Sequence, residues 1–297
     1  MHRIGSLTVR DGKVSVANRP LTQQQAAWDN EGIPTISRGE TFDTVESYIT
    51  ALLECHDNAI RCQENAIRNL GDGQSQLSNI LMMRALSNQF IGKRYRKGPF
   101  ILTLTNLQPH NIWVRNNGHI QYLIDLDWAC SLPVEMMTPP YWLVDLAASN
   151  DPDFATLTND FLNILQEREH IFPDYRHDSI ASVMRSSLQN GSFWYFRALQ
   201  SPDRVCQLFR EHIQGRYWPG DCSDPAFKTL VSRYWCPEAR EYIQRRIADR
   251  VSYNRKLRAI YMPHGLGSRG WRCQQTFIRD LCVRDPSTSS RYDVMML

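Results

Sequence analysis

The chain of 297 residues lacks any apolar run of the ~18 residues that a membrane-spanning helix requires. Its opening segment, Met1 to Ser6, has no apolar stretch of the kind that marks a secretory signal. Its eight cysteines contain no Cys-x-x-Cys pair and no regular framework, so we interpret them as reduced thiols, several of them in a core. These absences favour a cytoplasmic protein without a membrane partner.

Signatures of several common enzyme classes are missing as well. The sequence has no Gly-x-Ser-x-Gly elbow and no His-Glu-x-x-His motif. Cys55 and Cys62 lie seven residues apart, but His56 alone beside them does not make a zinc site. Hydrophobic residues make up 42% and charged residues 22% of the chain, which excludes a wholly disordered, collagenous or coiled-coil protein.

The small net charge of +3 hides an asymmetry along the chain. Residues 240–279 carry ten Lys or Arg against two acidic residues, a balance of +8, so the rest of the chain sums to −5. Ile243, Ile247 and Val251 recur at helical spacing there, which predicts a helix with one buried face and its arginines in water. The alternative is a segment that binds an acidic partner or nucleic acid.

Two short segments carry the pattern of β-hairpins. Residues 6–16 place β-branched runs on both sides of Asp11-Gly12, and residues 112–124 do the same around Asn117-Gly118. Both dipeptides tolerate the positive φ angles of a tight turn. Residues 100–105 form another strand-like run.

Helical periodicity dominates the rest of the chain. Apolar residues from Val45 to Ile60 form a stripe that includes His56, which we interpret as a hydrogen-bonded core histidine, and Asp43 with Glu46 fits a capping box. A second helical stretch runs from Leu77 to Phe90, and further helices are predicted at 154–169, 179–188, 192–199, 203–213 and 237–261. The predicted class is α+β, mainly helical.

One constellation indicates chemistry. A loop after the strand-like run presents Asn106 and Asn111, and the hairpin then returns the chain to Asp125, fourteen residues after Asn111. An Asn oxygen and an Asp carboxylate suit Mg²⁺, which binds few protein groups together with substrate phosphates. Kinase catalytic loops have this arrangement. A structural interpretation stays open, in which the Asn side chains tie the loop backbone together. We place His110 on the surface.

The motif around this loop resembles that of a known family. Asn106-Leu107-Gln108-Pro109-His110-Asn111-Ile112, followed by Ile124-Asp125, is similar to the D-L-x-x-x-N-I and I-D core of the aminoglycoside phosphotransferase and choline kinase family. More narrowly, a series of segments in order resembles the fungal aminoglycoside-phosphotransferase-like proteins, over roughly residues 3–262. These segments are Arg3-Ile4-Gly5-Ser6-Leu7, Asn18-Arg19-Pro20-Leu21, Gly98-Pro99-Phe100-Ile101-Leu102-Thr103-Leu104-Thr105, Asp125-Leu126-Asp127-Trp128-Ala129-Cys130-Ser131, Pro139-Pro140-Tyr141-Trp142-Leu143, Gly191-Ser192-Phe193-Trp194-Tyr195-Phe196 and Tyr253-Asn254-Arg255-Lys256-Leu257-Arg258.

The resemblance implies a protein-kinase-like C-terminal lobe with short β-hairpins, and phosphoryl transfer from ATP with Mg²⁺ to a hydroxyl of a small-molecule acceptor. Asn111 and Asp125 match the metal-binding Asn and Asp. Asn106 stands in place of the catalytic Asp, and a neutral amide is not a useful base, although it can orient a hydroxyl. Leu104 replaces a His that often stands two residues before the catalytic Asp. The site thus resembles that of a pseudokinase.

The resemblance also bears on domain organisation. In the family the segment that matches Ile4 to Leu7 follows the ATP-binding N-terminal lobe, so we expect that lobe to be absent here. Residues 265–270 satisfy Gly-x-Gly-x-x-Gly, but no strand precedes them, so we interpret them as a flexible loop. We expect a kinase-like lobe at residues 1–262 and an irregular C-terminal tail at 263–297.

Three hypotheses about function follow. The first is an aminoglycoside-phosphotransferase-like protein that is catalytically degraded. The second is an active ATP-dependent phosphotransferase whose nucleotide lobe comes from a partner chain. The third is a binding or adaptor protein that uses the basic segment 240–279, although the apolar stripe in that segment makes nucleic acid a poor candidate partner.

Overall fold

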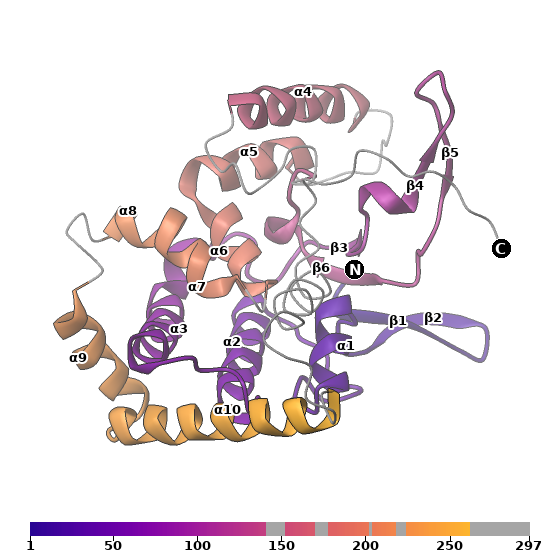
Figure 1. Ribbon diagram of the computed structural model, residues 1–297. Helices are drawn as coiled ribbons and strands as arrows, with labels where there is room; N and C mark the ends of the chain where they lie inside the picture. The colour runs from indigo at the N-terminus through magenta and orange to yellow at the C-terminus, as the bar shows by residue number, and fades with distance from the viewer. Residues whose placement is uncertain (141–151, 170–177, 202–203, 218–223, 262–297) are drawn as a thin grey trace.

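The computed structural model of the chain describes residues 1–140, 152–169, 178–201, 204–217 and 224–261. In this part of the chain the protein is α+β and mostly helical, with a small antiparallel sheet and a separate hairpin (Figure 1). This confirms the predicted class, while the kinase-like lobe remains a prediction. No helix among the described residues is long and apolar enough to span a membrane.

Along the described part of the chain, a β-hairpin is followed by three helices, then by four strands, and then by a series of helices. The strands are β1 (Gly5–Arg10), β2 (Lys13–Asn18), β3 (Phe100–Leu104), β4 (Ile112–Val114), β5 (Ile120–Leu123) and β6 (Ala129–Pro133). The helices are α1 (Gln23–Asn30), α2 (Val45–Cys62), α3 (Leu70–Phe90), α4 (Pro152–Glu169), α5 (Ile180–Asn190), α6 (Ser192–Leu199), α7 (Val205–Leu208), α8 (Gly215–Tyr217), α9 (Pro225–Trp235) and α10 (Ala239–Tyr261). Two 3-10 turns, η1 (Pro109–Asn111) and η2 (Val134–Met136), and a π-helical segment, η4 (Phe209–Gln214), complete the elements.

Strand β6 lies inside the four-stranded sheet, whose order is β2-β1-β6-β3 and whose pairs are all antiparallel. Asp11 and Gly12 connect β1 to β2 with φ angles of 51° and 71°, the left-handed conformations that a two-residue hairpin turn requires. The hairpin predicted near residues 6–16 is confirmed. Residues 1–40 contribute this hairpin and helix α1, and contain no further strand.

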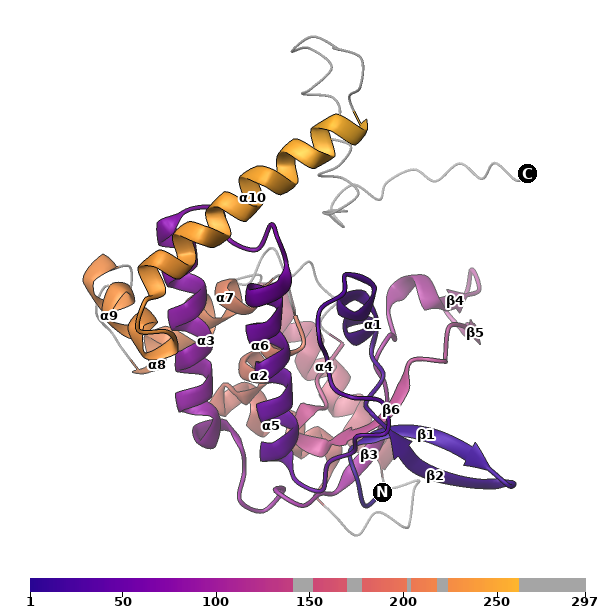
Figure 2. The same cartoon turned by 90° about the horizontal axis from the view of Figure 1, so that it is seen from below.

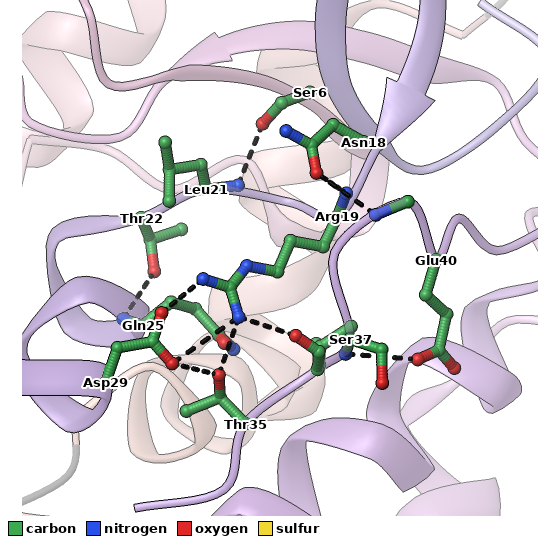
Figure 3. A network of polar contacts seen from close by, with 12 residues as sticks. Ser6, Asn18, Arg19, Leu21, Thr22, Gln25, Asp29, Thr35, Ser37 and Glu40 are labelled. Atoms are coloured by element: carbon green, nitrogen blue, oxygen red, sulfur yellow. Dashed lines mark hydrogen bonds and ion pairs between the residues drawn. The ribbon is translucent and has the colours of Figure 1, made fainter. Parts of the chain in front are cut away.

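A buried arginine joins the β1–β2 hairpin to helix α1 (Figure 3). Arg19 is 7% exposed; its guanidinium donates to the Ile36 carbonyl at 2.6 Å and to the Thr35 hydroxyl at 2.8 Å, and it forms an ion pair with Asp29. Because a buried guanidinium without acceptors is costly, these partners fix the chain between residues 18 and 36.

Helix α2 confirms the predicted stripe, since its apolar residues from Val45 to Ile60 face the core. His56 Nε2 lies 2.9 Å from the Leu199 carbonyl oxygen of α6, and burial lowers the pKa of this histidine to about 4. His56 is therefore a neutral core residue at pH 7, as predicted.

The predicted capping box of this helix is wrong. The Thr44 hydroxyl is the N-cap and accepts the backbone N–H of Ser47, so the helix begins one residue later than a cap at Asp43 would allow. The Asp43 carboxylate instead pairs with the Arg3 guanidinium at 2.8 Å. A threonine hydroxyl caps a helix well, which leaves the neighbouring carboxylate free for the ion pair.

A single carboxylate connects three helices. Asp57 of α2 is 5% exposed; it accepts from the Arg84 guanidinium of α3 at 2.7 Å and from the Trp235 indole N–H of α9 at 2.7 Å. Since a buried carboxylate must keep its donors, these two bonds hold α3 and α9 in register on α2.

The later helices follow the predictions with four exceptions. The three-residue helix α8 was not predicted. Helix α9 was not predicted, although Asp224 before Pro225 is a recognisable start signal, and Asp224 does cap it. The helix predicted at 203–213 begins outside the described residues and divides into α7 and the π-helical η4. In α10 only Ile243 of the predicted stripe is buried, because the helix projects beyond its neighbours, and Val251 is 53% exposed.

Helix α10 runs across the ends of α2 and α3 (Figure 2). Several of its basic residues bind the loop between those two helices: Arg250 donates to the Asn65 carbonyl at 2.6 Å, Arg246 donates to the Gln63 carbonyl, and Lys256 pairs with Glu64 at 3.2 Å. Part of the basic segment therefore stabilises the packing of α10 against the loop between α2 and α3.

A buried glutamate lies in η2, directly after strand β6. Glu135 of η2 is 8% exposed, and its Oε1 accepts the Gly92 N–H at 2.8 Å, while its Oε2 has no hydrogen-bond partner among the described residues. Burial, opposed by the Gly92 bond and reinforced by Glu46, raises the pKa of Glu135 to about 7.

We expect Glu135 to make stability depend on pH. Because the folded state holds its proton more tightly than the unfolded state, stability should fall as pH rises from about 4.5 to about 7 and then level off. Glu135→Gln should remove this slope and stabilise the protein at pH 8 by on the order of 2–3 kcal/mol. Urea denaturation at a series of pH values measures both effects. Glu167→Gln, at an exposed position of α4, is the control, and an equal gain there would contradict the prediction.

Candidate functional site

The pairing of β3 with β6 sets the base of the candidate loop. Leu104 pairs with Ala129, and the Thr105 N–H donates to the Trp128 carbonyl at 2.8 Å, so residues 106–127 leave and re-enter the sheet at one point. Two antiparallel neighbours joined in this way must present their connecting residues at the same end of the sheet.

The local sequence folds the first half of this loop. Pro109 begins the 3-10 turn η1, and the Asn111 N–H donates to the Gln108 carbonyl at 2.9 Å. Asn106 precedes this turn, Asn111 is its last residue, and each is 3% exposed. The predicted hairpin follows as β4 and β5, with Gly118 at a φ of 80° in its turn. The hairpin prediction for residues 112–124 is confirmed.

The loop brings Asn106, Asn111 and Asp125 together. The Asn111 Nδ2 donates to the Asn106 carbonyl at 2.8 Å and lies 3.4 Å from Asp125 Oδ2. The Asn106 Nδ2 donates to the same carboxylate oxygen. A shared magnesium ion would require the Asn111 side-chain oxygen and an Asp125 oxygen to point to a common position. In the structure the Asn111 amide nitrogen faces the carboxylate, and the same nitrogen donates to the Asn106 carbonyl.

Asp125 occupies an unusual backbone conformation. Its φ is 58°, in the left-handed region, where aspartate is tolerated better than most non-glycine residues. Such conformations cost free energy and persist where neighbouring contacts enforce them. Here the two amide donors hold the carboxylate at the mouth of the loop, and the residue itself is exposed.

A carboxylate and an amide oxygen are ligand types that magnesium accepts together with phosphate, but Asn111 presents its amide nitrogen, not its oxygen, to Asp125. Oδ1 of Asp125 and Oδ1 of Asn111 have no hydrogen-bond donor among the described residues, and Mg²⁺ typically binds one or two carboxylates besides substrate phosphates. Within the same residues no three His, Cys, Asp or Glu side chains gather to hold a metal ion. A magnesium site at Asn111 and Asp125 stays a prediction.

The remaining candidates lie elsewhere. His110 is exposed on η1, as predicted. Cys55 is buried while Cys62 is exposed, so the two thiols do not share a site. The Gly-rich residues 265–270, the tail 263–297 and part of the motif at 139–143 lie outside the described residues.

One residue of the site was not assigned a role from the sequence. Gln108 Nε2 lies 3.3 Å from Asn106 Oδ1 and so donates to the amide oxygen of that residue. Both ends of the Asn106 side chain are thereby engaged by protein groups. The sequence did offer a signal for this role of Gln108. It is a polar residue immediately before the Pro109 turn, and polar side chains at the start of a turn commonly form hydrogen bonds with nearby loop groups.

Comparisons with family models, with curated proteins and with solved structures find no match to this chain. The resemblance to aminoglycoside phosphotransferases therefore rests on the sequence motifs alone.

The convergence on Asp125 generates a test of the loop. Asp125→Asn should lower the free energy of unfolding by about 1 kcal/mol or more, because two N–H groups lose a charged acceptor. Asparagine tolerates the left-handed conformation as well as aspartate does, so backbone strain does not contribute. The matched control is Asp127→Asn at an exposed turn position, for which we expect a change within about 0.5 kcal/mol. Urea denaturation that gives equal losses for both variants would show that the amide contacts do not stabilise the loop.

Proposed function

We propose that this protein is an aminoglycoside-phosphotransferase-like protein with a catalytically degraded site, which binds a phosphate-bearing ligand weakly and transfers phosphoryl groups poorly. The observation that carries the proposal is the contact between the Asn106 amide and the Asp125 carboxylate. A neutral amide stands where phosphoryl transfer to a hydroxyl would use a carboxylate base.

Asn106 is poorly suited to proton transfer. Its nitrogen donates to Asp125, and its oxygen accepts from Gln108, so neither end is available as a base. General-base assistance contributes typically ~10²–10⁴-fold to a rate. Loose phosphoryl-transfer transition states depend mainly on positioning, so an amide that orients a hydroxyl supports a slow residual reaction.

The metal would be held by Asn111 and Asp125, and when bound it supplies charge neutralisation for phosphate oxygens. In the structure, two amide N–H groups already satisfy Asp125 Oδ2. A cation must therefore compete with protein donors for the carboxylate, and we expect weak Mg²⁺ binding.

The adaptor hypothesis has less support from the described part of the basic segment. In residues 240–261, Arg246, Arg250 and Lys256 bind the loop at 63–65, and Arg246 also pairs with Asp249 at 2.7 Å. Side chains engaged in these contacts are less available to an acidic partner.

The proposal predicts that a charge at position 106 creates dependence on magnesium. Asn106→Asp places two carboxylates in contact, which should destabilise the metal-free protein and strengthen Mg²⁺ binding. We expect the melting temperature of this variant to rise by several degrees in ~10 mM Mg²⁺, because a ligand at 100 times its Kd adds about 2.7 kcal/mol. The wild-type chain should shift by about a degree or less. Thermal denaturation with and without Mg²⁺ measures both.

The double variant Asn106→Asp/Asp125→Asn is the control. It keeps one carboxylate and one amide in contact, so it should lose the magnesium response of the single variant. A large Mg²⁺ response of the wild-type chain, or micromolar binding of ATP with Mg²⁺ by calorimetry, would contradict the proposal and favour the active phosphotransferase.

A further inference from the structure

The ribbon formed by β4 and β5 exposes an unusual amount of apolar surface. Trp113, Val114, Ile120, Tyr122 and Leu123 are 58%, 60%, 63%, 59% and 42% exposed. The ribbon projects from the body of the molecule and does not lie against the helices (Figures 1 and 2). Contiguous apolar surface on a soluble protein commonly marks an interaction site.

The ribbon also leaves strand edges open. Among the described residues β5 pairs only with β4, and the two form a two-stranded sheet of their own. Neither strand contains a charged residue or a proline, two of the features that protect natural edges from pairing with another chain, although the ribbon does contain a bulge at Gln121. A two-stranded hairpin alone is marginally stable in water. An additional strand paired with the ribbon would both bond its open backbone groups and stabilise the hairpin.

Backbone geometry indicates which groups of β5 are open. The Ile124 N–H bonds inward to the Asn111 carbonyl at 3.0 Å. By antiparallel alternation, the backbone of Leu123 then turns outward. The register shift between Trp113 and Val114 leaves Gln121 as a bulged residue without a partner on β4. These outward groups need hydrogen-bond partners that a protein strand supplies and a lipid surface does not.

We propose that β5 pairs antiparallel with β5 of a second copy of this chain across a two-fold axis near Tyr122. The product is a four-stranded sheet in which Gln121 of each copy faces Leu123 of the other. An isologous contact of this kind closes on itself and gives a discrete dimer. The inference is independent of the function proposed for the loop.

The charges on the ribbon are complementary in this arrangement. Its turn end carries Arg115 and His119, and its base carries Asp125 and Asp127. Antiparallel pairing centred on Tyr122 sets His119 of one copy opposite Asp125 of the other, and Arg115 lies beside His119, one strand further out. The basic turn end of each copy therefore lies near the carboxylates of the other, twice per dimer. The same pairing brings Arg115 of the second copy toward the candidate site at Asp125. This self-complementarity favours a second copy over an unrelated chain.

Analytical ultracentrifugation of the full chain without Mg²⁺ or nucleotide tests the proposal. We expect the mass to rise from one to two chains between ~1 and ~100 µM. Tyr122→Lys should weaken association by at least about tenfold, because each substitution is present twice at the interface. Tyr234→Lys is the matched control, since Tyr234 is 76% exposed on α9, away from the ribbon.

A charge exchange at the ribbon ends supplies a second test that does not alter the strand. Arg115→Asp and Asp127→Arg should each weaken the dimer, and the double variant should restore it. A wild-type chain that stays monomeric at ~100 µM overturns the proposal. A dimer unaffected by Tyr122→Lys, a double variant that fails to restore association, or open-ended aggregates in place of a dimer would do the same. Because these measurements need no metal, they leave the magnesium test of the loop unaffected.

Discussion

The structure depends on the antiparallel pairing of β6 with β1 on one side and β3 on the other. This one strand joins the N-terminal hairpin to the rest of the sheet, and its register with β3 closes the loop that carries Asn106, Asn111 and Asp125. Without the bond between Thr105 and Trp128, the two halves of the loop would be free to separate. The candidate site is therefore a consequence of sheet register.

In the loop between β3 and β6, the polar side chains form hydrogen bonds with one another. Asp125 receives two amide N–H groups, the Asn106 carbonyl receives one, and Gln108 engages the Asn106 oxygen. A carboxylate at position 106 would face Asp125 and require a cation or a proton between them. The neutral amide removes that requirement, so the loop keeps its shape with protein groups alone.

The sequence predicted the features that local chemistry controls. Asp11-Gly12 and Asn117-Gly118 located both hairpins, because few residues adopt the φ angles of such turns. The periodicity of α2 located its buried face and His56. Features set by tertiary contact were missed: the ion pair of Asp43, the division of the helix that contains η4, and the exposure of Val251, which depends on where the neighbours of α10 end. The convergence at Asp125 was predicted from spacing, but not the orientation of the Asn111 amide, which the Asn106 carbonyl decides.

The apolar ribbon and the polar loop belong to one segment of the chain. Apolar side chains are stabilised when another chain covers them, whereas a carboxylate is destabilised when it loses water. Asp125 lies two residues after the end of β5, so any chain that covers the ribbon also approaches the carboxylate. Removing water from an ionised group is costly unless donors compensate it, and Asn106 and Asn111 supply two such donors. The amide at 106 therefore makes it possible for an apolar surface to be covered beside a carboxylate. A carboxylate at 106 would oppose that covering, because two desolvated charges of one sign would lie at the edge of the contact.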